Sequence, residues 1–205
     1  TLERMARWLT PGSIAGLLLT GLALNAITMS VVGLCTYLAT DEQLRSLTFW
    51  TLGSLASASW LFGGVLVTAL VICHWRAQRL AHALNALALG EAAATHVGVN
   101  VPQLRSRLIS VVALLSALAV AWCGLIGFIG LMAPHLVRGL AGADQRRLLP
   151  LAMIAGALLL LVADTAARLV AIPAEIPVGI FTALIGGPLF LLILRGLARH
   201  QGGHA

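Results

Sequence analysis

The stretch GSIAGLLLTGLALNAITMSVVGLCTYL, residues 12–38, decides the class of fold, because it contains no charged side chain. About 20 apolar residues suffice to cross the hydrocarbon core of a bilayer as a helix, so this stretch predicts a tilted transmembrane helix. Of the 205 residues, 60% are hydrophobic and 10% are charged, whereas about 25% are charged in an average soluble domain. The composition excludes a water-soluble globular protein and predicts an integral membrane protein.

Further apolar runs predict about six crossings in all. They span residues 60–75, 108–126, 127–137, 148–172 and 178–194. The run at 127–137 is too short for a regular transmembrane helix, so we expect a short or broken span there. Gly124, Gly127 and Gly130 recur at every third residue, a spacing that permits close helix contact or a break. The predicted fold is therefore an all-α polytopic helical bundle.

The arginines fall very unequally on the two sides of such a bundle. All thirteen basic residues are arginines, and only Arg45 and Arg168 lie on the arginine-poor side. The positive-inside rule makes the other side cytoplasmic. That side carries Arg4, Arg7, Arg76, Arg79, Arg105, Arg107, Arg138, Arg146, Arg147, Arg195 and Arg199. The net charge of +6 is thus explained by the orientation of the protein in the membrane. Because the arginines are not interleaved with aromatic residues, the charge does not indicate nucleic-acid binding.

The longest segment between spans, residues 76–107, is predicted to be a structured cytoplasmic loop. It contains a helix-forming run through Glu91, then Gly98, then a restart at Pro102, which are typical helix start and stop signals. Two short helices with a glycine break would form a knob for a partner protein. The same pattern also suits a loop that only caps the bundle.

The predicted spans contain no arrangement of residues that is typical of a catalytic, metal or ion-coupling site. Cys35, Cys73 and Cys123 lie in apolar runs without CxxC spacing, and Asp164 is the only acid embedded in an apolar run. An intramembrane enzyme or an ion-coupled transporter needs further intramembrane acids, ligands or nucleophiles, and a channel needs a polar pore ring. The chain also lacks a GxxxxGK[ST] phosphate loop, so a transport role requires energy from a partner.

Three separated blocks of this sequence resemble the FecCD family, the permease subunits of ATP-binding-cassette (ABC) importers for iron chelates, haem and cobalamin. The blocks are ALGE at 88–91, GLIGFIGLMAPHLVRGLAGADQRRLLP at 124–150 and AEIPVGIFTALIGGPLFLLILRG at 174–196. They occur in the family's order and cover nearly the whole chain.

The resemblance implies a ten-span, type II importer permease in the bacterial inner membrane, of which about six spans are present here. Residues 1–205 are then expected to form a single permease domain, the C-terminal part of a longer permease. The family implies a homodimer, two cytoplasmic ATPase subunits that bind ATP and Mg, a periplasmic substrate-binding protein and surrounding lipid. The permease itself is expected to be non-catalytic and to hold no permanent cofactor or metal.

The resemblance also assigns candidate site residues. Those expected to engage the ATPase are Leu89, Gly90, Glu91, Ala92, Gly98, Val99, Pro102 and Arg105. Arg168 and Glu175 are candidates for docking the binding protein, although Asp164 and Arg168 have the spacing of a local ion pair on one helix face. Met29 and Tyr37, on the first span, are candidates for the translocation pathway, with packing as the alternative role.

The cargo is predicted from the stretch TYLATDEQLRSLTFWTLGSLASASW, residues 36–60, which most resembles haem permeases. Ferric siderophores and then cobalamin are the alternatives, because their permeases carry related stretches. His74, His96 and His135 are not expected to ligate haem, since their sequence contexts suit the interface, the loop and a general family motif. The expected mechanism is alternating access driven by the partner ATPases.

Overall fold

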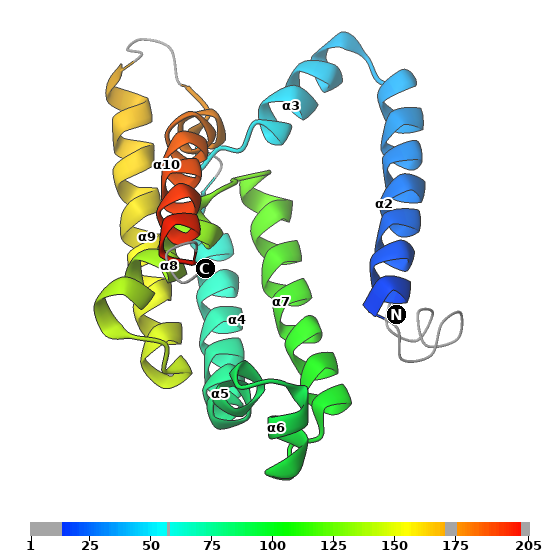
Figure 1. The fold of residues 1–205 in the computed structure, drawn as a ribbon. Coiled ribbons are helices and arrows are strands. Elements are labelled where there is room, and N and C mark those ends of the chain that lie inside the picture. The colour runs from blue at the N-terminus through cyan, green and yellow to red at the C-terminus, as the bar shows by residue number, and fades with distance from the viewer. Residues whose placement is uncertain (1–13, 57, 171–175, 202–205) are drawn as a thin grey trace. The chain divides into compact units, whose positions relative to one another are not determined.

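The computed structural model describes residues 14–56, 58–170 and 176–201, and the regular elements in these ranges are α-helices (Figure 1). In chain order they are α2 (Ile14–Tyr37), α3 (Asp41–Thr51), α4 (Trp60–Arg79), α5 (Ala81–Ala88), α6 (Glu91–His96), α7 (Val101–Cys123), α8 (Ile129–Ala141), α9 (Gln145–Val170) and α10 (Val178–Gln201). The predicted all-α class is confirmed.

Four stretches among the described helices are long and apolar enough to cross a membrane. They are Leu18–Tyr37, Trp60–Arg79, Val101–Cys123 and Gln145–Val170, and a shorter apolar stretch, Val178–Leu191, lies in α10. Helix α8 has 13 residues, or about 20 Å at 1.5 Å per residue, in line with the short span predicted at 127–137. Large apolar side chains are exposed along these helices, as expected of a multi-pass membrane protein.

The chain divides into two compact units, Thr1–Thr48 and Phe49–Ala205. In the first unit, the threonine and serine hydroxyls of α2 are satisfied within the helix: Thr28 Oγ1, for example, donates to the carbonyl oxygen of Leu24 at 2.8 Å. This back-bonding lets a polar side chain sit in an apolar helix. Asp41 and Glu42 occupy the first turn of α3, where the helix dipole favours negative charge, so the polar stretch after the first span becomes a helix.

In the second unit, the C-terminal end of α4 and the N-terminal ends of α7 and α9 lie at one end (Figure 1). Gln78 Nε2 donates to the carbonyl oxygen of Arg146 at 3.1 Å, which joins the end of α4 to the start of α9. We call this the arginine-rich end; it carries Arg76, Arg79, Arg105, Arg107, Arg138, Arg146 and Arg147. Helix α8 therefore brings the chain back to the arginine-rich end, as the predicted short crossing requires.

Capping residues set the true bounds of the loop predicted at 76–107. Helix α4 continues to Arg79, whose guanidinium lies 3.5 Å from the centroid of the Trp75 ring. Helix α7 begins before residue 108, at Val101, because the Asn100 side chain accepts the Gln103 N–H at 3.1 Å and Pro102 lies in the first turn. The expected second short helix is therefore the first turns of α7, and α5 and α6 form the short pair instead.

Three glycines meet at the opposite end of the second unit, and we call this contact the glycine junction. The N–H of Gly179 donates to the carbonyl oxygen of Gly53 at 3.2 Å. At Gly179, an added Cβ would lie 2.7 Å from the carbonyl oxygen of Leu125, and at Gly124 it would overlap the carbonyl oxygen of Trp50. The main chains before α4, after α7 and at the start of α10 can approach this closely only without side chains.

The recurring glycines that the sequence singled out therefore differ in role. Gly124 has a φ of +69° and ends α7 at the glycine junction, whereas an added Cβ at Gly127 or Gly130 would meet nothing within 4 Å. Of the two predicted roles, close contact is confirmed at Gly124 and a break at Gly127, which lies between α7 and α8, whereas Gly130 lies within α8 without a close contact in this structure.

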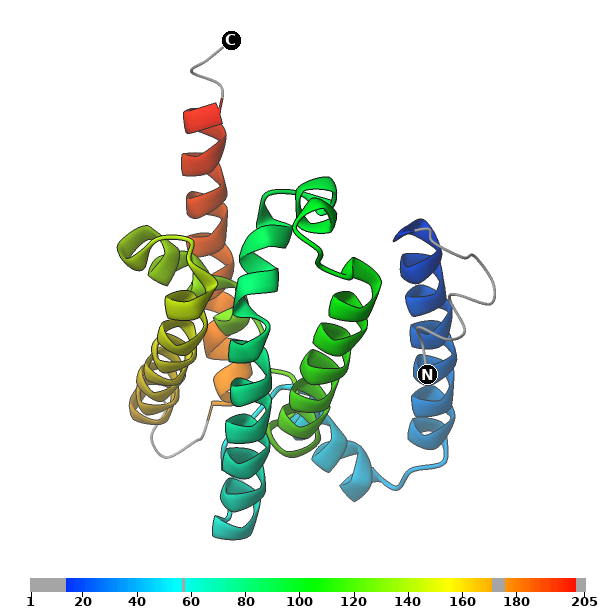
Figure 2. The same ribbon diagram turned by 90° about the horizontal axis from the view of Figure 1, so that it is seen from below.

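Helices α8 and α9 lie side by side in two perpendicular views (Figures 1 and 2). Gly156 of α9 allows this, because a Cβ there would already touch Ala133 Cβ at 3.6 Å and Ile129 Cγ2 at 3.7 Å. Helix α10 approaches the start of α8 in the same way, since a Cβ at Gly186 would lie 2.6 Å from Phe128 Cβ. Small residues thus hold α8 between α9 and α10 at short range, a common mode of packing in membranes.

Candidate coupling site at the arginine-rich end

The corner between α5 and α6 presents an apolar side chain to solvent at the arginine-rich end. Gly90 has a φ of +110°, a conformation that glycine adopts without steric cost, and this sharp change of direction starts α6 at Glu91. The neighbouring Leu89 is 81% exposed. A single exposed leucine is common on protein surfaces, so Leu89 becomes a candidate contact only through its place beside Glu91 and the start of α6.

Helix α6 is tied to α7 by an ion pair. Arg105 Nη2 donates to Glu91 Oε1 at 2.5 Å, and the two side chains are 35% and 58% exposed. An exposed pair of this kind contributes only about 0–1 kcal/mol to stability. Its main effect is to fix where the short helix lies on the first turns of α7.

Gly98 ends α6 with a φ of +81°. The N–H of Gly98 donates to the Thr95 carbonyl and that of Val99 to the Ala94 carbonyl, both at 3.0 Å, the hydrogen-bonded reversal that often follows a helix with a C-terminal glycine. The predicted break is confirmed at Gly98. The structure thus gathers the predicted coupling residues into one surface over α6 and its two flanking turns: Leu89, Gly90, Glu91, Ala92, Gly98, Val99, Pro102 and Arg105.

A second set of polar contacts at this end joins α5 to the α8–α9 turn, and the sequence analysis missed it. Asn85 Nδ2 donates to Asp144 Oδ1 at 2.7 Å, and the N–H of Gln145 donates to Asn85 Oδ1 at 2.9 Å. Arg146 Nη2 lies 2.9 Å from His82 Nδ1; arginine can only donate, so this His82 nitrogen accepts. We call His82, Asn85, Asp144, Gln145 and Arg146, with Gln78, the polar clasp.

Asp144 is held in its ionised form by these contacts. The hydrogen bond from Asn85, then that from the Arg146 N–H, lower the pKa of the Asp144 carboxyl below its ordinary value of 3.8, and the charges of Arg146 and Arg147 add to this. A lowered folded-state pKa stabilises the fold above the unfolded value, and this contribution is lost as the pH falls through the folded pKa. Asp144 is therefore ionised at neutral pH and accepts both of these hydrogen bonds.

The other predicted site residues belong to other segments of the chain. Arg168 Nε donates to Asp164 Oδ2 at 2.8 Å in α9, so the expected local ion pair is present. Glu175 lies outside the described residues. Met29 and Tyr37 are exposed on α2, in the first unit. Within the described ranges, no group of three histidine, cysteine or acidic residues is placed to hold a metal ion.

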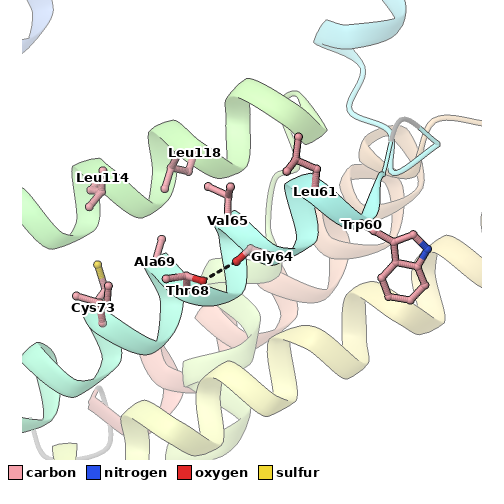
Figure 3. A pocket seen from close by; sticks show the side chains of 10 residues that line it. Trp60, Leu61, Gly64, Val65, Thr68, Ala69, Cys73, Leu114 and Leu118 are labelled. Atoms are coloured by element: carbon pink, nitrogen blue, oxygen red, sulfur yellow. Dashed lines mark hydrogen bonds between the residues drawn. The ribbon is translucent and has the colours of Figure 1, made fainter.

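An apolar groove of about 650 Å³ runs between α4 and α7 (Figure 3). Its walls include Leu61, Val65, Leu114 and Leu118, and the Thr68 hydroxyl is turned to the Gly64 carbonyl at 2.8 Å. A surface of this character suits an apolar helix or lipid acyl chains rather than a charged group.

Comparison with known proteins places this architecture in a single family. Residues 4–196 match the FecCD transport family. The chain is 36% identical to a solved metal-chelate type ABC transporter in an inward-facing conformation, with a TM-score of 0.86 over 94% of this chain and 63% of that one.

Curated relatives agree on the family and differ in cargo. The chain is 47% identical to the hemin transport system permease HmuU of Yersinia pestis, over 97% of this chain and 59% of the relative. It is 41% identical to the vitamin B12 import permease BtuC of Vibrio parahaemolyticus (88% and 54%) and 38% identical to the Fe(3+) dicitrate permease FecD of Escherichia coli (94% and 59%). The chain spans little more than half of each relative, and it belongs to the FecCD transport family, whose members are transport components and not enzymes.

Proposed function

We propose that the chain is part of the permease of an ATP-driven ABC importer that moves haem across the bacterial inner membrane. The observation that carries the cargo is the 47% identity to a hemin permease along 97% of the chain. Ferric siderophores and cobalamin remain the alternative cargoes, because permeases for Fe(3+) dicitrate and vitamin B12 are 38% and 41% identical to this chain.

The proposed mechanism is alternating access driven from the arginine-rich end. Two cytoplasmic ATPase subunits, which bind ATP and Mg, would contact α5 and α6 of a permease homodimer and displace them as they close. The permease makes no covalent bond and needs no cofactor of its own. Apolar surfaces such as those of α2 would bind the cargo weakly, while a periplasmic binding protein supplies affinity, so a bulky chelate can pass without being trapped.

The cargo is tested by growth on a single iron source. A strain without the gene is supplied with hemin or with a ferric siderophore and is complemented with the full-length protein. We expect growth to fail on hemin alone and to return on complementation. Failure on the siderophore alone would overturn haem and keep the transporter class, and normal growth on both would direct the test to cobalamin.

Glu91→Ala is expected to lower hemin uptake per ATP hydrolysed by about fivefold, the lower end of the roughly 5- to 150-fold range of typical coupling energies. The reason is that α6 loses its ion pair with Arg105 of α7, so that α6 and α7 no longer move together. The measurement is uptake and ATP hydrolysis by the complete transporter in liposomes. Exchanging the charges with Glu91→Arg and Arg105→Glu together should restore part of the coupling, and wild-type coupling in Glu91→Ala would contradict the assignment.

We further propose that Arg168 and Glu175 face the binding protein. Arg168→Ala is expected to slow association with that protein roughly two- to fivefold at low salt, because a rim charge acts mainly on the association rate. At about 1 M salt the screening length is about 3 Å, so the difference should vanish. Association rates at several salt concentrations provide the test, and equal rates at low salt would contradict a role of Arg168 in docking.

A further inference from the structure

The polar clasp connects two parts of the fold that are far apart in the chain. Asn85 and His82 belong to α5, whereas Gln145 and Arg146 begin α9 and Asp144 directly precedes it. The contacts are 2.7 Å from Asn85 to Asp144, 2.9 Å from the Gln145 N–H to Asn85, and 2.9 Å between Arg146 and His82. Several directional bonds in one place fix the relative position of the two segments more firmly than a single contact.

On its α9 side, the clasp is part of the helix start. Asp144 precedes α9, its side chain accepts the Arg146 N–H at 3.1 Å, and its carbonyl oxygen accepts the Leu148 N–H at 2.8 Å. Asp144 therefore caps the helix N-terminus. Any pull on Asp144 acts on the whole of α9, and on α8 as well, because Gly156 lets Ala133 approach closely.

On its α5 side, the clasp lies next to the predicted ATPase contact. Helix α5 leads through the corner at Leu89 and Gly90 directly into α6. Ala81 of α5 and Ala94 of α6 are fully buried, so the two short helices are held in place rather than free. The Glu91–Arg105 pair ties the same short helices to α7.

We propose that the polar clasp is a positioning element that transmits displacement of α5 and α6 to α8 and α9 during transport. This inference rests on the proposed function, and it adds a second mechanical connection to the Glu91–Arg105 pair. The Glu91–Arg105 pair passes force from the ATPases to α7, and chain continuity through Leu80 passes it to α4. With the clasp, it also moves the closely packed α8–α9 pair.

The bonding of Asn85 provides a sharp test. The Gln145 main-chain N–H can only donate, so it must bond to the side-chain oxygen of Asn85. The side-chain nitrogen of Asn85 therefore faces Asp144. Asn85→Asp removes that donor and sets two carboxylates against each other. Combining Asn85→Asp with Asp144→Asn removes the carboxylate pair, restores the net charge and leaves an acceptor for the Gln145 N–H. Because Asp144 Oδ1 accepts both the Asn85 amide and the Arg146 N–H, the amide introduced by Asp144→Asn can restore the side-chain bond only by giving up the bond from Arg146.

The experiment uses the complete transporter, with full-length permease, ATPase and binding protein, in liposomes. Hemin uptake and ATP hydrolysis are measured together, and the ratio of the two reports coupling. We expect Asn85→Asp to lower this ratio at least about fivefold and the double variant to recover part of it. Gln145→Glu is the matched control, because it adds the same charge beside Asp144 while the clasp uses only the main-chain N–H of Gln145.

The amount of folded protein is compared by size-exclusion profile and thermal unfolding in detergent. A variant that only weakens the fold changes the yield without changing the ratio, and that result would overturn the proposal. If Asn85→Asp does not reach the membrane, Arg146→Ala, which removes the bond to His82 and a positive charge near Asp144 but keeps the main-chain bonds, is expected to lower the ratio by a smaller factor. An unchanged ratio in Arg146→Ala would then overturn it.

The same assay separates the clasp from the cargo. If the wild-type transporter hydrolyses ATP without accumulating hemin, the cargo proposal fails. The variants are then compared with ferric siderophore or cobalamin in place of hemin. If the wild type transports one of these and Asn85→Asp transports it with the same yield per ATP, the clasp proposal fails by itself.

Discussion

Replacing Gly124 by alanine is expected to lower the free energy of unfolding of the permease by about 2–5 kcal/mol. Gly124 has a φ of +69°, and a side chain in the left-handed region costs roughly 1–2 kcal/mol. Its Cβ would also overlap the carbonyl oxygen of Trp50, and overpacking of this kind adds about 1–3 kcal/mol. Since main-chain atoms cannot rotate away, the glycine junction must open.

The control for this prediction lies three residues further along. Gly127 is in the same connection, and a Cβ there would meet nothing within 4 Å, so Gly127→Ala should unfold like the wild type. Thermal unfolding and folded yield in detergent measure both variants. Equal stability of Gly124→Ala and Gly127→Ala would show that the glycine junction does not require close main-chain contact.

Replacing Leu89 by aspartate is expected to weaken binding of the ATPase subunits by roughly 30-fold or more, the effect of losing an interface hot spot of about 2 kcal/mol. Leu89 is 81% exposed at the corner of α5 and α6, so the change removes little packing from the permease itself. An apolar side chain that enters a pocket on a partner loses its whole contribution when a charge takes its place. Affinity between purified permease and ATPase is the measurement.

Leu140 is the matched control for this experiment. It is 91% exposed at the end of α8, also at the arginine-rich end but outside the two short helices. Leu140→Asp should change the affinity by less than about twofold, within the range of near-neutral contacts around a hot spot. Unchanged binding in Leu89→Asp, or equal losses in both variants, would contradict docking through α5 and α6.

The candidate coupling surface could be predicted from the sequence because its residues are contiguous. Gly90 and Gly98 flank a short helix-forming stretch, and both have a positive φ in the structure. Local conformational preference is sufficient to place such breaks. The helix bounds were less predictable, because caps such as Asn100 extend α7 beyond its apolar run.

The polar clasp could not be found in this way. Asn85 and Asp144 are separated by 59 positions, and each is an ordinary polar residue in a polar loop. The available signal was Asp144 itself, an acidic residue placed to cap the next helix. Its partner depends on where α5 lies, and that depends on packing between elements.

The amino-acid sequence alone determined the membrane class, the approximate spans and the sided distribution of arginine, because hydrophobic length and charge act on each segment independently of its neighbours. Only the tertiary structure decided which glycines lie against the main chain of another segment and which loops are joined by hydrogen bonds. Gly53, Gly124 and Gly179 look like Gly127 and Gly130 in the sequence. They differ in the main-chain atoms that lie against them, and those contacts arise only when distant segments pack together.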